Sequence, residues 1–194
     1  MTNTMTDLFG GFPNITWIDV ETGGLDESTD KLFEVAAIVT DRNLNILDPL
    51  GFNMVIHYPK EEVAKLRNAA VPLVQDMHDK TGLWDRMPSG TPRHEVDEKL
   101  HEYISQFSEP RTSWLGGNSI TLDRNFLRAN LRQSFAHLSY RSIDVSTISG
   151  LAKAWFGVTY EKKLLHAAFS DITESIEELR FYRENIFKPT PENK

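Results

Sequence analysis

Two carboxylates, Asp19 and Glu21, stand at the end of an apolar run and directly before a Thr-Gly-Gly turn. Residues 15–20 (Ile-Thr-Trp-Ile-Asp-Val) predict a short buried strand. Because residues two apart on a strand point to the same face, the two carboxylates converge on one patch. Two like charges at close range ionise with difficulty unless a cation lies between them. The pair therefore predicts an oxygen-only site for Mg²⁺ or Mn²⁺.

Asp123, His166 and Asp171 are further candidates for chemistry, and each also has an ordinary structural interpretation. Asp123 lies at the start of a predicted helix, where the helix dipole favours a negative charge without any metal. Within one regular helix His166 and Asp171 cannot face the same point, because five residues rotate by about 140°. If the two cooperate, His166 lies in the loop before the last helix and Asp171 in its first turns. Taken singly, His166 is a packed or exposed histidine and Asp171 is a solvated helix charge.

The pattern of apolar residues indicates three consecutive strands followed by alternating helices and strands. This order implies a mixed sheet with helices packed on it, an α/β fold. The strands are expected at residues 15–20, 32–40, 44–57, 114–117 and 142–145, and the helices at 92–107, 123–135, 146–156 and 167–185, with helical texture from residue 60 onward.

The chain has 194 residues, 40% of them hydrophobic, a net charge of −7 and no cysteine. This length predicts one domain over residues 14–187, with a flexible N-terminal segment over 1–13 and a disordered tail over 188–194. No apolar stretch approaches the roughly 18 residues of a membrane span, and residues 1–14 lack the features of a signal peptide. Together with the missing cysteines, this predicts a cytoplasmic protein without a membrane partner. The acidic charge disfavours a broad grip on long nucleic acid but permits a short ligand.

The ordered set of four carboxylates and one histidine resembles the DEDD exonuclease superfamily in its histidine-bearing subtype. Further motifs resemble oligoribonucleases in particular, in order and at the expected spacing, from about residue 17 to residue 187. These motifs are Trp-Ile-Asp-Val-Glu at 17–21, Gly-Leu-Asp at 24–26, the segments 39–47 and 174–183, Gly-Asn-Ser-Ile at 117–120 and Tyr-Arg-Ser-Ile-Asp-Val-Ser at 140–146.

The resemblance implies an RNase H-like fold with a mixed five-stranded sheet flanked by helices. It implies that Asp19, Glu21, Asp123 and Asp171 hold two divalent ions, Mg²⁺ or Mn²⁺, and that His166 is the general base. The implied activity is 3′-to-5′ exoribonuclease cleavage of very short RNA, dinucleotides above all, to 5′-mononucleotides. A DEDD exonuclease for single-stranded DNA and a catalytically silent nucleic-acid-binding module are the alternatives.

Preference for very short RNA requires a site that closes behind the 5′ phosphate. The resemblance places Ser119, Arg141 and Ser146 in this phosphate cap, with Tyr140 contributed by the partner of a homodimer. Arginine suits the role because its planar guanidinium binds phosphate in a bidentate way. The alternatives are that Ser146 only caps the following helix and that Arg141 is a surface charge.

Two other residues are assigned to the substrate by resemblance, Leu25 as a wedge between the bases and His78 near the scissile end. The alternatives are a core leucine and an ordinary exposed histidine. The chain departs from many family members at Thr22-Gly23-Gly24, where the extra glycine is expected to loosen the turn. It also has Leu73 where many members carry a tryptophan, which predicts weaker substrate binding because base stacking is worth about 1–3 kcal/mol.

Overall fold

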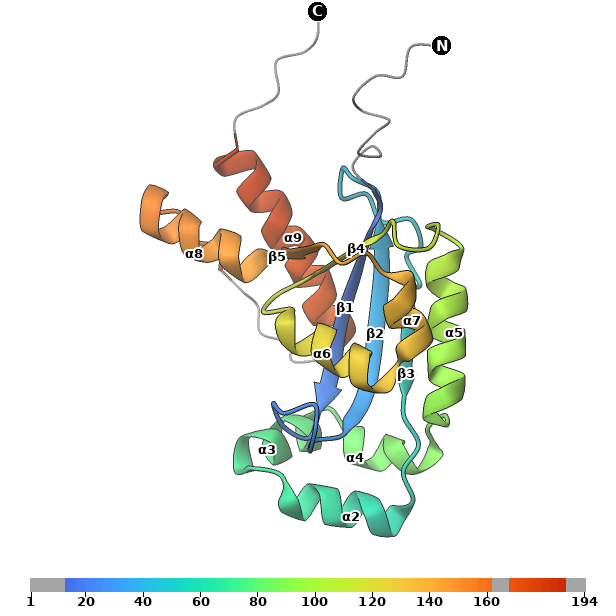
Figure 1. Cartoon of the computed structure of the whole chain (residues 1–194). Coiled ribbons are helices and arrows are strands. Elements are labelled where there is room, and N and C mark those ends of the chain that lie inside the picture. Colours follow the sequence, from blue (N-terminus) through green and yellow to red (C-terminus); the bar gives the residue numbers. More distant parts are fainter. Residues whose placement is uncertain (1–12, 162–167, 188–194) are drawn as a thin grey trace, which may run out of the picture.

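The computed structural model describes residues 13–161 and 168–187 and contains a five-stranded sheet in the order β3-β2-β1-β4-β5 (Figure 1). The first three strands are antiparallel neighbours: β1 (Ile15–Thr22), β2 (Leu32–Thr40) and β3 (Phe52–Val55). The other two, β4 (Trp114–Gly117) and β5 (Ser142–Asp144), run parallel to β1. The predicted mixed sheet of five strands is therefore confirmed.

Helices cover both faces of the sheet because β1 and β2 are apolar on both sides (Figure 1). Ile18 and Val20 point toward the face packed by α5 (Arg93–Ser105), α6 (Thr121–Asn130) and α7 (Arg132–His137). Ile15 and Trp17 point toward the opposite face, packed by α8 (Val145–Phe156) and α9 (Ala168–Asn185). Asp19 and Glu21 continue the alternation of Ile15 and Trp17, so they face α9.

A cluster of short helices lies at the end of the sheet where β1 terminates (Figure 1). It consists of α2 (Lys60–Ala69), α3 (Pro72–Lys80), α4 (Leu83–Arg86) and the 3₁₀ turn η1 (Met87–Ser89). Phe33 of β2 enters the separate small core of this cluster, beside Trp84 and Leu83. The cluster thereby forms a wall next to the carboxylate end of β1.

Two predicted elements are wrong in their extent. The strand predicted over 44–57 is reduced to β3, because Leu44 (φ 68°) and Gly51 (φ 59°) adopt left-handed conformations that interrupt an extended chain. The helix predicted over 123–135 is broken at Leu131 (φ −125°, ψ 71°) into α6 and α7. Asp97 of α5 stabilises the break by accepting the backbone N–H groups of Gln133 and Ser134 in the first turn of α7.

The predicted flexible N-terminal segment, apart from residue 13, and the predicted tail lie outside the described residues. Within the described ranges, none of the helices combines the length and the apolar character needed to cross a bilayer.

Candidate active site

Three carboxylates from two distant parts of the chain meet at the end of β1. Asp19 and Glu21 share one face of the strand, and Asp171 lies in the first turn of α9, the helix that covers that face. One oxygen from each side chain lies within 4.8 Å of the others. The predicted convergence of Asp19 with Glu21, and their meeting with Asp171, are both seen in the structure.

The site concentrates negative charge in a place that disfavours it. Burial is the main cause that raises the pKa of Asp19 well above its usual range, followed by repulsion from Asp123 and Glu21. Burial also raises the pKa of Glu21 to about 7, with further contributions from Glu34 and Asp171. A divalent cation would relieve this repulsion, and an all-oxygen donor set is the one that Mg²⁺ and Mn²⁺ prefer. The residues present therefore fit a divalent metal site.

Asp123 approaches the same strand from α6, on the other side of the sheet. Strand β4 pairs only with residues 15–17 of β1, so the Val20 N–H lies beyond the end of β4. Asp123 Oδ1 accepts this N–H at 3.0 Å, and its side chain is buried. Burial raises the pKa of Asp123 to about 7. The carboxylate is thus held against β1 and not merely placed near a helix dipole, and its charge acts on Asp19.

His166, the predicted general base, lies outside the described residues. The structure places Asp171, its predicted companion, in the first turn of the helix that follows.

His78 is buried at 2% exposure, so its interpretation as an exposed histidine is wrong. Its Nε2 lies 3.0 Å from the Thr22 carbonyl, which can only accept, so Nε2 carries a proton and donates. Nδ1 lies 3.8 Å from Glu21 Oε2, which alone would favour the imidazolium, but burial outweighs this and lowers the pKa of His78. The His78 ring also makes edge-on contacts with the rings of Phe33 and Trp84. His78 therefore holds the end of β1 beside Glu21.

Sequence reasoning missed an ion pair behind Glu21. Glu34 lies directly opposite Glu21 in the β1–β2 register and is 4% exposed. Arg86, at the end of α4, binds it with two hydrogen bonds of 2.8 and 2.9 Å. A single charged residue inside the apolar strand 32–40 was the available signal, because a buried carboxylate needs a partner.

Ser119 and Ser146, two residues of the predicted phosphate cap, lie side by side. The backbone N–H of Ser119 donates to Ser146 Oγ at 2.8 Å, and the two hydroxyl oxygens are 3.1 Å apart. The N-cap of α8 is Asp144, whose carboxylate accepts the Ser146 N–H at 2.9 Å. The alternative that Ser146 merely caps this helix is therefore wrong. Asn118, which the sequence did not single out, accepts the Ser146 hydroxyl.

Arg141 and Tyr140 are not joined to these serines by any contact seen among the described residues. They lie before β5, whereas Ser146 lies after it. The Arg141 Nε–H donates to the Tyr140 hydroxyl at 3.1 Å, and its guanidinium lies 5.4 Å from the centre of the Trp114 ring. Tyr140 is 82% exposed.

The turn after β1 presents Leu25 to solvent at 80% exposure, so its interpretation as a core leucine is wrong. Two hydrogen bonds close the turn that carries the extra glycine. Gly23 N–H donates to the Lys31 carbonyl at 2.9 Å and the Thr22 hydroxyl to the Gly24 carbonyl at 2.7 Å. Leu73, at the start of α3, is 69% exposed.

Comparisons with known proteins agree with this geometry. The family profile described as RNase_T, exonuclease, matches residues 16–179. An oligoribonuclease of Nocardia farcinica is 42% identical over 183 residues, covering 91% of this chain and 82% of the relative. An oligoribonuclease of Leifsonia xyli is 40% identical over 182 residues, covering 91% and 86%.

Solved structures with a similar fold include Escherichia coli exonuclease I in complex with an oligonucleotide, with a TM-score of 0.67 at 15% identity. A moderately thermophilic exonuclease I from Methylocaldum szegediense has a TM-score of 0.64 at 20% identity. The match covers 90% of this chain but only 41% of either exonuclease I chain. At such low identity the likeness shows the fold alone, which is RNase H-like.

Proposed function

Because the chain belongs to the oligoribonuclease family of exonucleases, we propose that it is a 3′-to-5′ exoribonuclease that degrades very short RNA, dinucleotides above all, to 5′-mononucleotides. The observation that carries this proposal is the meeting of Asp19, Glu21 and Asp171 within 4.8 Å, with Asp123 held against the same strand. The protein is a nuclease, and we assign phosphodiester hydrolysis to these four carboxylates at the end of β1.

The four carboxylates would hold two divalent ions, Mg²⁺ or Mn²⁺. When bound, such ions make a water acidic and neutralise the charge that develops on the leaving 3′ oxygen. The role of the protein is to keep the ligand oxygens fixed before the metal arrives. β1 does this for Asp19 and Glu21, α9 for Asp171, and the Val20 N–H for Asp123.

His166 is proposed to take the proton from the attacking water, since the pKa of histidine is normally near neutrality. His78 is proposed to lie near the scissile end of the substrate. Its Nε2–H is already given to the Thr22 carbonyl, so it acts by holding the strand end that carries Glu21.

Length selectivity is proposed to come from a cap on the 5′ phosphate built by Ser119 and Ser146, with Leu25 as the wedge between the two bases. Arg141 and Ser146 flank β5 at opposite ends, separated by about 10–13 Å of strand. Arg141 is paired with Tyr140, the residue that the resemblance assigns to the partner subunit. We therefore propose that both residues reach the cap of the partner in a homodimer.

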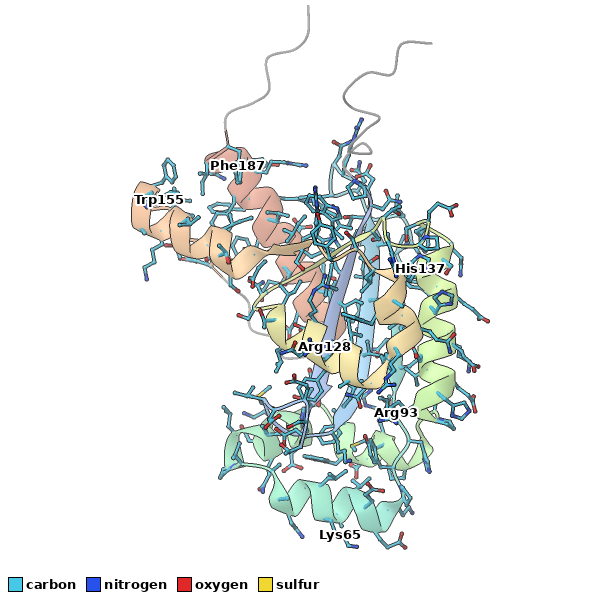
Figure 2. The ribbon with its side chains drawn as sticks, viewed as in Figure 1. Lys65, Arg93, Arg128, His137, Trp155 and Phe187 are labelled. Carbon is cyan, nitrogen blue, oxygen red and sulfur yellow. The ribbon has the colours of Figure 1, made fainter. Side chains whose placement is uncertain are left out.

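The outer surface of α8 supports the homodimer. Trp155 and Phe156 are 69% and 58% exposed, and Leu151 is 40% exposed. Trp155 lies at the outer end of α8, away from the sheet (Figure 2). Apolar side chains gathered on one helix commonly mark a protein interface. The missing cysteines fit a cytoplasmic location, which we also propose.

The test is a length-dependence assay. Labelled RNA of two and of twenty nucleotides, and a single-stranded DNA of twenty, are incubated with the protein in Mg²⁺ or in EDTA. We expect metal-dependent conversion, with the dinucleotide strongly preferred. Preference for the DNA would favour a proofreading-type exonuclease, and no turnover in Mg²⁺ or Mn²⁺ would favour a silent binding module.

A further inference from the structure

A continuous hydrogen-bond network connects the serine pair of the proposed cap with α9. Its central member is Asn118, which follows β4 and is half-buried. The Asn118 side chain contacts Ser146 on one side and two residues of α9, Ser175 and Glu178, on the other. Ser175 and Glu178 are 5% and 1% exposed. The network is therefore largely protected from water.

The orientation of the Asn118 amide is determined by its partners. Asn118 Nδ2 lies 3.1 Å from Glu178 Oε2 and 2.8 Å from Ser175 Oγ. A carboxylate only accepts hydrogen bonds, so the NH₂ group must face Glu178. Ser175 donates its own hydroxyl proton to the Asp171 carbonyl at 2.9 Å and is free to accept from Asn118. Asn118 Oδ1 must consequently face Ser146.

This orientation determines the role of each serine hydroxyl. Ser146 donates its proton to Asn118 Oδ1 at 3.1 Å, and its oxygen then accepts the Ser119 N–H at 2.8 Å. Ser119 adopts a left-handed conformation with φ 53°, which is costly for a serine and is stabilised by that N–H contact and a second one to Asp144. Because the Ser146 proton is used on Asn118, the Ser119 hydroxyl is the donor in the 3.1 Å contact between the two hydroxyls. Ser119 is the exposed member of the pair, so its hydroxyl is the one that can turn its proton to an anion.

The same network reaches the metal-ligand helix. Ser175 bonds the backbone carbonyl of Asp171, and Glu178 Oε1 accepts the Tyr182 hydroxyl at 3.3 Å. Contacts with the same helix, α9, therefore hold both the proposed cap and the carboxylate cluster in position. A phosphate bound at the cap therefore lies at a defined distance from the ligands that act on the other end of a dinucleotide.

We propose that Asn118 is a positioning residue that sets the selectivity of this enzyme for a 5′-phosphorylated dinucleotide. It acts through the Ser146 oxygen, which it holds in place to accept the Ser119 N–H, and so keeps the Ser119 backbone in its left-handed conformation with the Ser119 hydroxyl exposed. The inference rests on the proposed function, because it assumes that Ser119 and Ser146 cap the 5′ phosphate.

The experiment compares two dinucleotide substrates, one with a 5′ phosphate and one with a 5′ hydroxyl, using full-length protein in Mg²⁺. For Asn118→Ala we expect KM for the phosphorylated substrate to rise about tenfold, the effect of losing one well-ordered hydrogen bond, while KM for the hydroxyl substrate and kcat change much less. The ratio of kcat/KM between the two substrates should therefore fall about tenfold. A merely structural role would lower activity on both substrates alike.

Asn130→Ala is the matched control. Like Asn118, Asn130 is half-buried and uses its side-chain amide in two hydrogen bonds, donating to the Phe126 carbonyl and accepting from Arg93. It lies at the far end of α6, away from the serine pair. Its replacement should leave the substrate ratio unchanged. Should Asn118→Ala fail to fold, Ser175→Ala provides the second variant, with an expected two- to threefold fall in the ratio from losing one of the two anchors of the amide.

The outcomes are distinct. If the parent protein hydrolyses both substrates equally, the proposed cap is refuted together with this inference. If the parent prefers the phosphorylated substrate and the folded Asn118→Ala variant keeps that preference, only the role of Asn118 is refuted. A fall in the ratio confined to Asn118 and Ser175 variants supports it.

Discussion

Replacement of Asp123 by asparagine should stabilise the metal-free protein while removing its activity. The buried carboxylate accepts the Val20 N–H, and asparagine Oδ1 can accept the same bond. Asparagine cannot ionise, so the substitution removes the negative charge of the Asp123 carboxylate. Burial raises the pKa of Asp123 from 3.8 to about 7, so the folded protein holds this proton more tightly than the unfolded chain does. In the metal-free parent, stability is therefore lost as pH rises from about 4 to about 7.

The magnitude follows from this shift. At about 1.4 kcal/mol per pKa unit, the ionised carboxylate costs at most about 4 kcal/mol above pH 7. Water and neighbouring dipoles relax around the charge, and about 1–2 kcal/mol is expected to remain. For a chain of this size that corresponds to a rise in Tm of roughly 2–8 °C for Asp123→Asn at pH 8.

The assay is thermal unfolding of parent and variant in EDTA at pH 5 and pH 8, repeated with Mg²⁺. We expect the variant to be more stable at pH 8, a smaller difference at pH 5, and a reversal in Mg²⁺, which should stabilise only the parent strongly. Asp97→Asn is the control, because this buried aspartate accepts hydrogen bonds from Gln133 and Ser134 and should be destabilising at both pH values. A variant no more stable than the parent at pH 8, or one stabilised equally by Mg²⁺, would refute the proposed electrostatic conflict.

Three further results are expected. Mg²⁺ added at pH 6.5 should release protons, because the pKa values of Glu21 and Asp123 are about 7 without metal, and the release should be smaller at pH 9, where these two groups are already ionised; equal release at both pH values would contradict the ligand set. Leu73→Trp should lower KM for a dinucleotide roughly fivefold through base stacking, and an unchanged KM would show that this exposed side chain does not meet the base. Mixed dimers of Asp123→Asn and Arg141→Ala subunits should regain activity if Arg141 acts on the partner, whereas mixtures no more active than the separate variants would place it in its own site.

Local patterns in the sequence determined a large part of this protein. The alternation along residues 15–22 was sufficient to place Asp19 and Glu21 on one face, and the order of apolar segments was sufficient for a mixed sheet covered by helices. The extents of elements were less predictable. The strand is interrupted at Leu44 because this residue adopts a left-handed conformation. The helix is interrupted at Leu131, where Asp97 from another helix stabilises the break. Neither cause can be predicted from the periodicity of apolar residues.

Only the tertiary structure decided how the remaining side chains are used. Because β4 ends early, the Val20 N–H is available to bond with Asp123. The β1–β2 register places Glu34 opposite Glu21, and Arg86 pairs with Glu34. Asn118, which lies outside every predicted element, bonds to Ser146. Arg141 lies before β5 and bonds to Tyr140, whereas Ser146 lies after β5, although one sequence motif contains all three. The periodicity of apolar residues involves only neighbouring residues, so it can be read from the sequence. Hydrogen-bond partners and the environments of buried charges depend on contacts between segments far apart in sequence, and these contacts form only when the sheet and its helices pack together.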